Sequence, residues 1–424
     1  MSVKSHSQKN KYPRSGKSFT HQFDSKTSMK KNVAILFSDF GPYHVARIEA
    51  LAEALKTQGD DLYAYRFSES STIYGWKPVV PTNAKVITLG TGEPTGVMKS
   101  IKLASNFGKS LRQQKIKTAF LISYSPLPNL LCIFTAKLAG CKIVMMNESW
   151  RLTESASFFG KLVKHVAVRM FNSALVGGHP HKQYAIDYGM NPSRVFLGYD
   201  VVDGRYFEVQ AARWKNEAAD NLPVANLPSR YFLNLGRFVT KKNIPSLIKA
   251  YAGLMEHYPA LDISLVLVGE GNEEKAIRQL AADLKIPTRE GLTQANNSGN
   301  KAEIVFYPFQ QVDITPLFFS RCEAFILPSM YEEWGLVVNE AMACSSAVIV
   351  SENVGCAADL VINDVNGFQF NPTSVEQLKG ILEKFVKDTA LSKRLGAEGC
   401  KHIRKWGPEK FAEGGMAAIA ATGS

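Results

Sequence analysis

The sequence predicts an α/β protein made of two successive blocks, each a parallel sheet with helices on both faces. Short apolar runs alternate with amphipathic helical patterns along most of the chain, which is typical of such sheets. With 424 residues, the chain is too long for one ordinary hydrophobic core. A mostly polar stretch, residues 211–229, separates two regions of similar length and contains Pro223 and Pro228.

The first block is predicted to open with a buried strand over residues 32–37, whose sequence is Asn-Val-Ala-Ile-Leu-Phe. A turn containing Gly41 follows, and then an amphipathic helix over 45–56. We expect further strands at 61–65, 85–88, 119–123, 142–146 and 174–176, and helices at 97–113 and 129–139.

The second block repeats this alternation, without detectable internal sequence repetition. We expect its strands at 231–235, 264–268, 303–306, 324–327 and 347–350, with a polar loop inserted at 291–301. The predicted domains are therefore a tail (1–31), a first domain (32–210), a linker (211–229), a second domain (230–400) and a C-terminal helical segment (401–424) that returns to the first domain.

Charge is unevenly distributed along the chain. The net charge is +12, and residues 1–31 hold eight basic residues against one acidic residue. This tail is poor in apolar residues, so we expect it to be disordered. Two interpretations of the tail stay open: it is attracted to an anionic surface, or it is a solvated extension without a function. We expect no nucleic-acid partner.

Hydropathy and cysteine spacing indicate where in the cell the protein is expected. There is no apolar signal segment near the start and no run of about 18 apolar residues that could span a membrane. The six cysteines are scattered, without the spacing of a zinc site. We therefore expect reduced thiols in a cytoplasmic protein.

The most informative segment is residues 331–343, in which Glu332 and Glu340 lie eight positions apart around Gly335. An apolar strand precedes it and good helix formers follow, so a helix should begin near Gly335. The first amides of such a helix, at Leu336 and Val337, suit a phosphate. Glu340 lies roughly 8 Å further along the helix, about the span from a diphosphate to a ribose. The alternative is a surface helix with glutamates at this spacing by chance.

A basic loop follows the first strand of the second block. Gly236 permits close backbone approach, Arg237 offers a forked contact to phosphate oxygens, and Lys242 adds a point charge. Lys241 is expected to be solvated. The alternative is an ordinary basic loop between a strand and a helix. No Asp-x-Asp motif follows a strand, so we expect neither a metal nor another cofactor to be required.

Together these segments resemble the retaining glycosyltransferases of family four. Glu332 and Glu340 match an E-x7-E motif, and Arg237 and Lys242 match a G-R-x4-K pattern. The resemblance is strong over residues 230–375 and weak over 32–210. It implies the GT-B fold, in which two Rossmann-like domains face each other across a cleft.

The resemblance also implies an activity. A sugar would pass from a nucleoside diphosphate, UDP or GDP, to an acceptor hydroxyl, with the α configuration kept. Glu332 would bind hydroxyls of the donor sugar and Glu340 those of the ribose, while Arg237 and Lys242 would hold the leaving diphosphate. Sugar, lipid-linked and other hydroxyl acceptors are all compatible with it.

Three further residues are assigned to the donor by the same resemblance. Gly41 lies where the family's glycine-rich loop approaches the phosphates, although here the loop has one glycine followed by Pro42. Gly269, in Val-Gly-Glu-Gly, would lie near the base or ribose, and Phe309 near the nucleobase. Buried strand ends without a ligand would also explain the last two.

The acceptor side is less well defined. Where relatives often carry a His or Asp, this chain has Asn147 and Glu148. Glu148 is a candidate base for the acceptor hydroxyl or a stabiliser of positive charge on the sugar ring, and otherwise a helix cap. His44 would touch the sugar or acceptor, or cap its helix. His179 is an acceptor-side or structural group.

Residues 157–171 form a predicted amphipathic helix with lysines beside its apolar face. It would dock on an anionic membrane surface, so that the protein is peripheral at the inner face, or it is an ordinary helix with a solvated basic side. Two other functions stay open: a nucleotide-sugar epimerase of the same fold, and a degenerate scaffold protein that has lost catalysis.

Overall fold

The computed structural model describes residues 30–69, 79–91, 96–122, 124–154, 158–218, 221–293 and 302–423. Nearly all of the basic tail and most of the polar loop at 291–301 lie outside the described residues. The predictions made for those two segments are therefore left as predictions.

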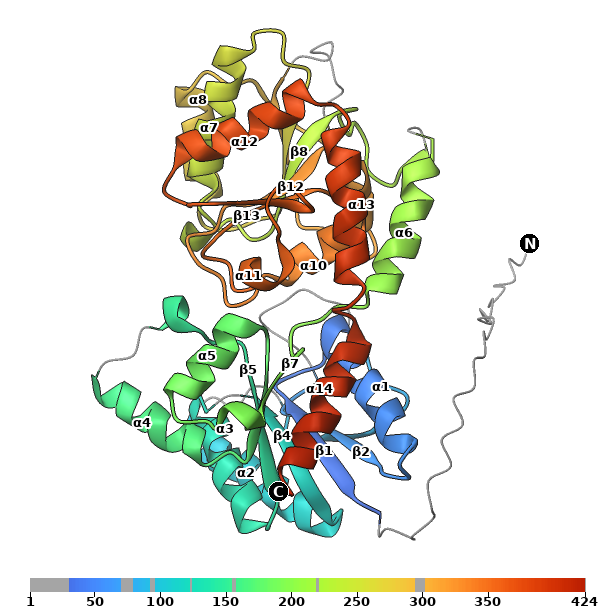
Figure 1. The fold of residues 1–424 in the computed structure, drawn as a ribbon, viewed down its shortest axis with the longest axis vertical. Helices are drawn as coiled ribbons and strands as arrows, with labels where there is room; N and C mark the ends of the chain where they lie inside the picture. The colour runs from blue at the N-terminus through green and yellow to red at the C-terminus, as the bar shows by residue number, and fades with distance from the viewer. Residues whose placement is uncertain are drawn as a thin grey trace, which may run out of the picture. The chain divides into compact units, whose positions relative to one another are not determined.

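The first block is built on a parallel sheet of seven strands, in the order β3-β2-β1-β4-β5-β6-β7 (Figure 1). The parallel register begins with Val33 of β1 opposite Leu62 of β2. The strands are β1 (Asn32–Phe37), β2 (Leu62–Arg66), β3 (Lys85–Thr88), β4 (Ile116–Ile122), β5 (Lys142–Asn147), β6 (Ser173–Val176) and β7 (Val195–Leu197).

Helices cover both faces of this sheet. They are α1 (Pro42–Lys56), α2 (Val97–Gln113), α3 (Leu127–Leu138), α4 (Phe158–Arg169) and α5 (His179–Asp187), with short 3₁₀ turns η1 (Arg151–Thr153) and η2 (Pro192–Arg194). Alternate residues of β1 enter different cores: Ala34 and Leu36 pack toward α2 and α3, whereas Ile35 packs toward α1. This alternation is the period-2 pattern of a strand buried on both faces.

The second block has another parallel sheet of seven strands, in the order β10-β11-β9-β8-β12-β13-β14. Its strands are β8 (Tyr231–Leu235), β9 (Ser264–Val268), β10 (Thr288–Glu290), β11 (Ile304–Tyr307), β12 (Ala324–Leu327), β13 (Val348–Ser351) and β14 (Gly367–Phe370). The predicted fold class of two α/β blocks is therefore confirmed.

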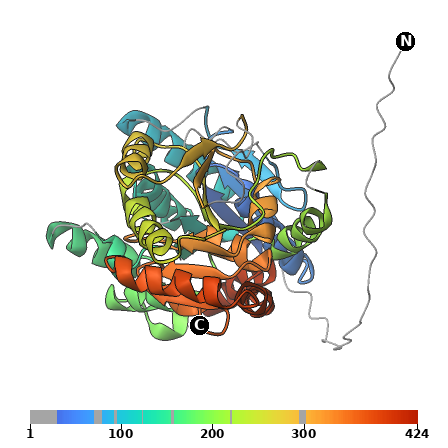
Figure 2. The ribbon, with the colours of Figure 1, turned by 90° about the horizontal axis from the view of Figure 1, so that it is seen from above.

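The helices of the second block also form two layers. They are α6 (Gly204–Asn216), the turn η4 (Thr240–Lys242), α7 (Ile244–His257), α8 (Glu274–Asp283), α9 (Thr315–Arg321), α10 (Leu336–Ala343), α11 (Ala357–Leu360), α12 (Val375–Lys387) and α13 (Leu391–Ile403). Helices α7 and α12 pack together on one face of the sheet, as both views show (Figures 1 and 2). Helices α6, α9 and α10 cover the other face.

The last helix, α14 (Pro408–Ala421), packs against α1 and against strands β6 and β7 of the first block (Figure 1). Its Gly414 approaches the carbonyl of Leu197 so closely that a Cβ there would lie 2.4 Å from the oxygen. A small residue is needed at this position because helix and strand are in direct backbone contact.

The element boundaries depart from prediction at a few places. Helix α1 begins at Pro42 rather than at residue 45, because proline is well suited to the first helical turn. The polar stretch at 211–229 begins as the end of α6, whose Ala211 and Trp214 are buried in the second block. Three strands, β7, β10 and β14, were not predicted; β10 is Thr-Arg-Glu, which has no apolar pattern to detect.

Candidate functional site

The site is built around the carboxyl ends of β8 and β9, where two glycines let two loops touch. Gly236 has φ +156° and Gly269 has φ +145°. A Cβ on Gly269 would lie 1.9 Å from the carbonyl oxygen of Gly236, and a Cβ on Gly271 would lie 2.2 Å from that of Phe238. The loop that carries Arg237 therefore rests directly on the loop after β9. Arg237 itself is exposed.

Two lysines from turn η4 converge on the loop after β12. The Lys242 ammonium lies 2.7 Å from Glu332 Oε1. The Lys241 ammonium lies 2.8 Å from Glu333 Oε2 and 3.5 Å from Glu332 Oε2. The prediction that Lys241 is solvated was wrong, because the tight turn directs both adjacent lysines toward the same pair of carboxylates. Burial opposes the charge on Lys241, but these carboxylates raise its pKa.

Glu332 is held in place from several sides. Its side chain is buried, and Ser329 donates a hydrogen bond of 2.8 Å to Oε1. Burial acts to raise the pKa of this carboxyl, but Lys242, Lys241 and the hydrogen bonds outweigh burial and lower it. Glu332 is therefore an ionised group at the end of β12, in contact with the cation that the G-R-x4-K pattern singled out.

Helix α10 begins directly after this loop. Its N-cap, Gly335, has φ +95°, and a Cβ there would lie 2.8 Å from Val354 Cγ1, so a glycine is required for both reasons. Leu336 and Val337 are the first two residues of the helix. Amides in a first helical turn have no acceptor within the helix, and the helix dipole is positive at this end.

Glu340 lies further along α10 and is buried. The Tyr43 hydroxyl, from α1 of the first block, donates a hydrogen bond of 2.6 Å to Glu340 Oε1. Burial raises the pKa of the Glu340 carboxyl to about 7, while the Tyr43 hydrogen bond acts in the opposite direction. Tyr43 was not among the predicted site residues.

A cavity of about 400 Å³ lies at the ends of β9 and β11. Gly269 is part of its lining, together with Phe306 and Pro308. Phe309 follows this lining directly; it is 42% exposed, and its amide donates to Glu270 Oε1 at 3.3 Å. Charged side chains also line this cavity, among them Arg278, whose guanidinium lies 4.0 Å from the centroid of the Phe306 ring.

In the first block, Gly41 and His44 act together at the start of α1. The Gly41 amide donates to His44 Nδ1 at 3.2 Å, so the imidazole caps the helix. The ring stacks on Phe37 with 4.4 Å between centroids. Burial and the nearby Arg47 lower the pKa of His44 to about 3, which keeps the imidazole neutral. Gly41 has φ −93°, a conformation that does not itself demand glycine.

Asn147 and Glu148 lie at the carboxyl end of β5. Asn147 is buried, and its Oδ1 accepts a 2.7 Å hydrogen bond from the Ser149 amide. The Glu148 side chain is exposed, but the protein around it removes part of its solvation, and this together with the negative charge of Glu333 acts to raise its pKa. Glu148 and Asp200 are close enough for each carboxyl to affect the pKa of the other.

Asp200 is a site residue that the sequence did not reveal. It is fully buried at the start of the segment after β7, and its Oδ1 lies 3.3 Å from Arg47 Nη2. Burial and the adjacent Glu148 raise the pKa of Asp200 well above its ordinary value. Nothing in the local sequence separates this aspartate from an ordinary polar loop residue.

His179 is the first residue of α5 and is largely exposed. Its backbone amide donates to Asp359 Oδ2 at 2.9 Å, and its ring also contacts the same carboxylate. This pairing explains Gly178, where a Cβ would lie 2.0 Å from Asp359 Oδ2. The structure thus gives His179 a contact to α11 of the second block.

Among the described residues, no group of three or more His, Cys, Asp or Glu side chains is placed to hold a metal ion. The expectation that no metal is required remains a prediction. The described part of the chain also contains no helix long and apolar enough to cross a membrane.

Two parallel α/β sheets of this kind are the architecture of the GT-B class. Solved structures agree over nearly the whole chain. A sucrose-phosphate synthase from Thermosynechococcus elongatus aligns with a TM-score of 0.68 and 17% identity, covering 93% of this chain and 100% of that one. Anabaena Alr3699/HepE, solved in complex with UDP, aligns with a TM-score of 0.65 and 16% identity, covering 93% and 100%.

The family comparison is specific to the second block. Residues 217–294 and 291–402 match the model of the family Glycosyl transferases group 1. The uncharacterized glycosyltransferase YqgM of Bacillus subtilis is 30% identical over 177 residues, 42% of this chain and 44% of that protein. The serotype-specific mannosyltransferase WbdA of Escherichia coli is 28% identical over 185 residues, 43% of this chain and 20% of that protein. The matched region spans less than half the length of these relatives.

Proposed function

We propose that this protein is a retaining glycosyltransferase that moves a sugar from a nucleoside diphosphate, UDP or GDP, to an acceptor hydroxyl. The observation that carries the proposal is the ionised Glu332, held 2.7 Å from Lys242 at the start of the loop that leads into α10. A carboxylate for sugar hydroxyls, a cation for phosphate and a helix N-terminus are thereby gathered at one end of the sheet.

The chemistry follows from these groups. The bond between the anomeric carbon and the diphosphate oxygen breaks, and a bond to the acceptor oxygen forms on the same face of the sugar. The acceptor's proton passes to a base, for which an oxygen of the departing diphosphate and the Glu148 carboxylate are the two candidates. Arg237, Lys242 and the amides of Leu336 and Val337 stabilise the charge that grows on that group. No metal is required in this scheme.

The remaining donor contacts are assigned by position. Glu340 binds the ribose hydroxyls, and Tyr43 shares its carboxylate. Gly269 lines the cavity at the ends of β9 and β11, Phe309 follows its lining in sequence, and this cavity accommodates the base. Gly41, at the start of α1, approaches the phosphates from the first block.

The acceptor binds at the carboxyl ends of the first sheet, where Asn147, Glu148 and His44 lie. Glu148 is the candidate base there, since a raised pKa makes its ionised form more basic. His179, the first residue of α5, is assigned to the acceptor side as well. The relative from Campylobacter jejuni, 26% identical over 207 residues, is named for an acceptor on diphospho-undecaprenol, which favours trials with lipid-linked sugars.

A thermal-shift titration of the purified protein with UDP, GDP and ADP, and with their sugar conjugates, tests the donor assignment. A ligand that binds the native state raises the melting temperature by mass action. A shift with one nucleotide supports the proposal and selects the donor for transfer assays. No shift with any of them would favour the scaffold alternative.

Two outcomes separate the remaining alternatives. Conversion of a nucleotide sugar to its epimer without an acceptor would support the epimerase reading. If transfer is found, NMR of the anomeric centre in the first product decides between retention and inversion.

We also propose that the first block docks on an anionic membrane surface. Large apolar side chains are exposed on helix α4, at Leu162 and Val166, and also at Met98 of α2 and Leu138 of α3, with exposures between 57% and 78%. Lysines 99, 102 and 161 accompany them. Apolar contact beside basic charge is the pattern of an interfacial surface.

Flotation with vesicles of phosphatidylglycerol, compared with phosphatidylcholine, tests this docking. Leu162→Glu should reduce binding to the anionic vesicles. The matched control is Val209→Glu on α6, an equally exposed apolar residue of a helix in the second block. Equal binding by both variants and the wild type would contradict docking through α4.

A further inference from the structure

Two consecutive carbonyl groups of the loop that carries Glu332 are bound by side chains of the first block. Trp150 Nε1 donates to the carbonyl of Glu332 at 2.7 Å. His181 Nε2 lies 2.8 Å from the carbonyl of Glu333. These contacts join residues more than 150 positions apart in the chain.

The tautomer of His181 is set by its two partners. The Gly178 amide donates to Nδ1 at 3.2 Å, so the proton of the neutral ring is on Nε2, which faces a carbonyl. The side chain is buried, and burial lowers its pKa, while the Glu333 carbonyl and the Asp359 carboxylate act to raise it. A neutral imidazole that donates from Nε2 satisfies both contacts.

The same loop is also confined by packing. A Cβ on Gly355 would lie 1.9 Å from the carbonyl oxygen of Glu333 and 3.0 Å from His181 Cε1. The His181 ring lies 5.5 Å from the Trp334 ring and 6.2 Å from the Trp150 ring, measured between centroids. The peptide at 332–333 is therefore held between the segment at Gly355 and two aromatic donors.

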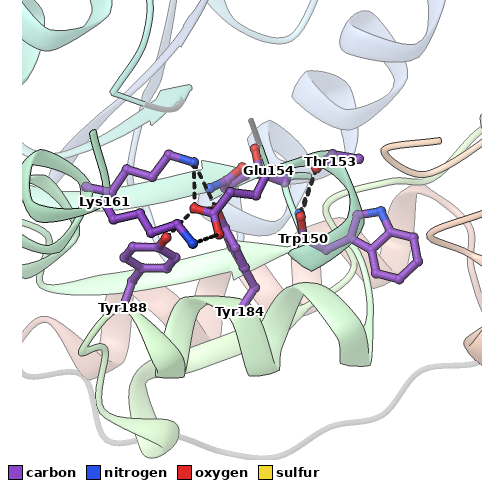
Figure 3. A network of polar contacts seen from close by, with 9 residues as sticks. Trp150, Thr153, Glu154, Lys161, Tyr184 and Tyr188 are labelled. Carbon is purple, nitrogen blue, oxygen red and sulfur yellow. Dashed lines mark hydrogen bonds and ion pairs between the residues drawn. The ribbon is translucent and has the colours of Figure 1, made fainter. Parts of the chain in front are cut away.

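Glu154 connects the segment of His181 with the turn of Trp150, and Figure 3 shows its contacts with Tyr184 and Tyr188. The Tyr184 hydroxyl donates to Glu154 Oε1 at 3.1 Å, and Tyr188 donates to the same oxygen. Both tyrosines follow His181 along the same segment, α5 and its C-cap. Lys164 and Lys161 pair with the Glu154 carboxylate at 3.2 and 3.5 Å (Figure 3).

On the other side, Glu154 directly follows the η1 turn that presents Trp150. The Trp150 carbonyl accepts from the Thr153 amide at 3.0 Å, and the Trp150 amide donates to Thr153 Oγ1 at 3.1 Å (Figure 3). The carboxylate has a pKa of about 2, since hydrogen bonds from Tyr188 and Lys164 outweigh the effect of burial. It stays ionised, so the link between α5 and the turn persists at neutral pH.

We propose that Trp150 and His181 are positioning residues that fix the Glu332 carboxylate by holding the two carbonyls of its loop. The inference rests on the proposed function, in which Glu332 binds the donor sugar. The carbonyl and carboxylate of Glu332 belong to one residue, so fixing the peptide fixes the starting point of the side chain. The diphosphate and ribose contacts come from other segments, the Gly236 loop and α10.

Because the sugar contact and the nucleotide contacts come from different segments, catalysis and nucleotide affinity can be tested separately. Trp150→Phe and His181→Phe remove the donating N–H groups but keep aromatic rings. Loss of one such hydrogen bond should lower kcat by about tenfold. The affinity for UDP or GDP, whichever shifts the wild-type melting temperature, should stay within about twofold, because neither nucleotide carries the sugar that Glu332 binds.

The control is Trp406→Phe. Trp406 packs 5.4 Å from Trp334 between ring centroids, so this variant changes the same aromatic cluster without changing either carbonyl contact. It should retain wild-type kcat. His181→Gln, which keeps an N–H donor, should recover part of the activity that His181→Phe loses. A purely structural role predicts no such recovery.

The outcomes distinguish the two proposals. If wild-type protein neither binds a nucleotide nor transfers sugar, the proposed function fails. If wild type transfers sugar and Trp150→Phe matches its kcat, the positioning role is overturned while the function stands. A parallel loss of kcat and nucleotide affinity would also overturn it. Should Trp150→Phe not fold, Glu154→Gln replaces it, and unchanged kcat in that variant counts against the proposal.

Discussion

The hydrogen bond between Tyr43 and Glu340 leads to a prediction that can be tested without knowing any substrate. The Tyr43 hydroxyl lies 2.6 Å from Glu340 Oε1, and the carboxyl is only 5% exposed. Tyr43→Phe removes the hydroxyl and leaves the ring. The buried carboxylate then loses a donor that favours its charged form.

The size of the effect follows from the pKa of Glu340. Burial raises it from the ordinary 4.5 to about 7. At about 1.4 kcal/mol per pKa unit, ionising this group costs the folded state roughly 3 kcal/mol more than the unfolded chain. The native state binds the proton more tightly, so this contribution to stability is fully present below pH 4.5 and is lost as the pH rises through about 7.

Tyr43→Phe should therefore have a pH-dependent cost. Above pH ~8 the carboxyl is charged, and losing a hydrogen bond to it should cost about 1.5–3 kcal/mol. Near pH ~5 the carboxyl is neutral, and the cost should fall to about 0.5–1.5 kcal/mol. Glu340→Gln removes the group that titrates. Its free energy of unfolding, compared with that of wild type, should therefore increase as the pH rises.

The assay is urea unfolding of wild type, Tyr43→Phe, Glu340→Gln and the double variant at these two pH values. The double variant is the matched control: with a neutral amide at position 340, Tyr43→Phe should cost the same at both pH values. An identical cost of Tyr43→Phe at high and low pH in the wild-type background would refute the reasoning, because Glu340 would then not be the group that titrates.

Three further outcomes are expected. Glu332→Gln should abolish sugar transfer and cost about 1–3 kcal/mol of stability, because Lys242 loses its ionised partner; full transfer activity would remove Glu332 from the mechanism. Gly269→Ala should destabilise the fold by more than about 2 kcal/mol, since its Cβ would meet the Gly236 carbonyl at 1.9 Å, and an unchanged melting temperature would show that the loops can separate. Arg237→Ala should weaken transition-state stabilisation by about 2–4 kcal/mol, measured as turnover, and a loss smaller than about tenfold would contradict its role.

Local sequence predicted much of the donor-side arrangement because its parts are close together in the chain. Gly335, Leu336 and Glu340 belong to one strand–loop–helix unit, and its order follows from an apolar run, a glycine and helix formers. The same holds for Gly236 and Lys242, which lie on one loop and turn. Such units keep their geometry wherever the rest of the chain goes.

Contacts between distant segments could not be read in this way. Lys241 looked like a solvated neighbour of Lys242, yet the turn brings it to Glu333. Tyr43, Trp150 and His181 reach the second block across more than 150 residues of chain. The sequence around each of these residues contains no recognisable motif. Only the residue that each one contacts in the second block indicates a role.

The sequence by itself determined two parallel sheets and the loops that end their strands, because apolar period and glycine placement are local properties. Tertiary structure alone decided which carboxylates are charged and which carbonyls are bound. Those properties depend on burial and on the partners that the fold supplies: Lys242 and Lys241 lower the pKa of Glu332, whereas burial raises the pKa of Glu340. A periodic pattern indicates that a side chain is inside the protein, but it carries no information about the group that the side chain meets there.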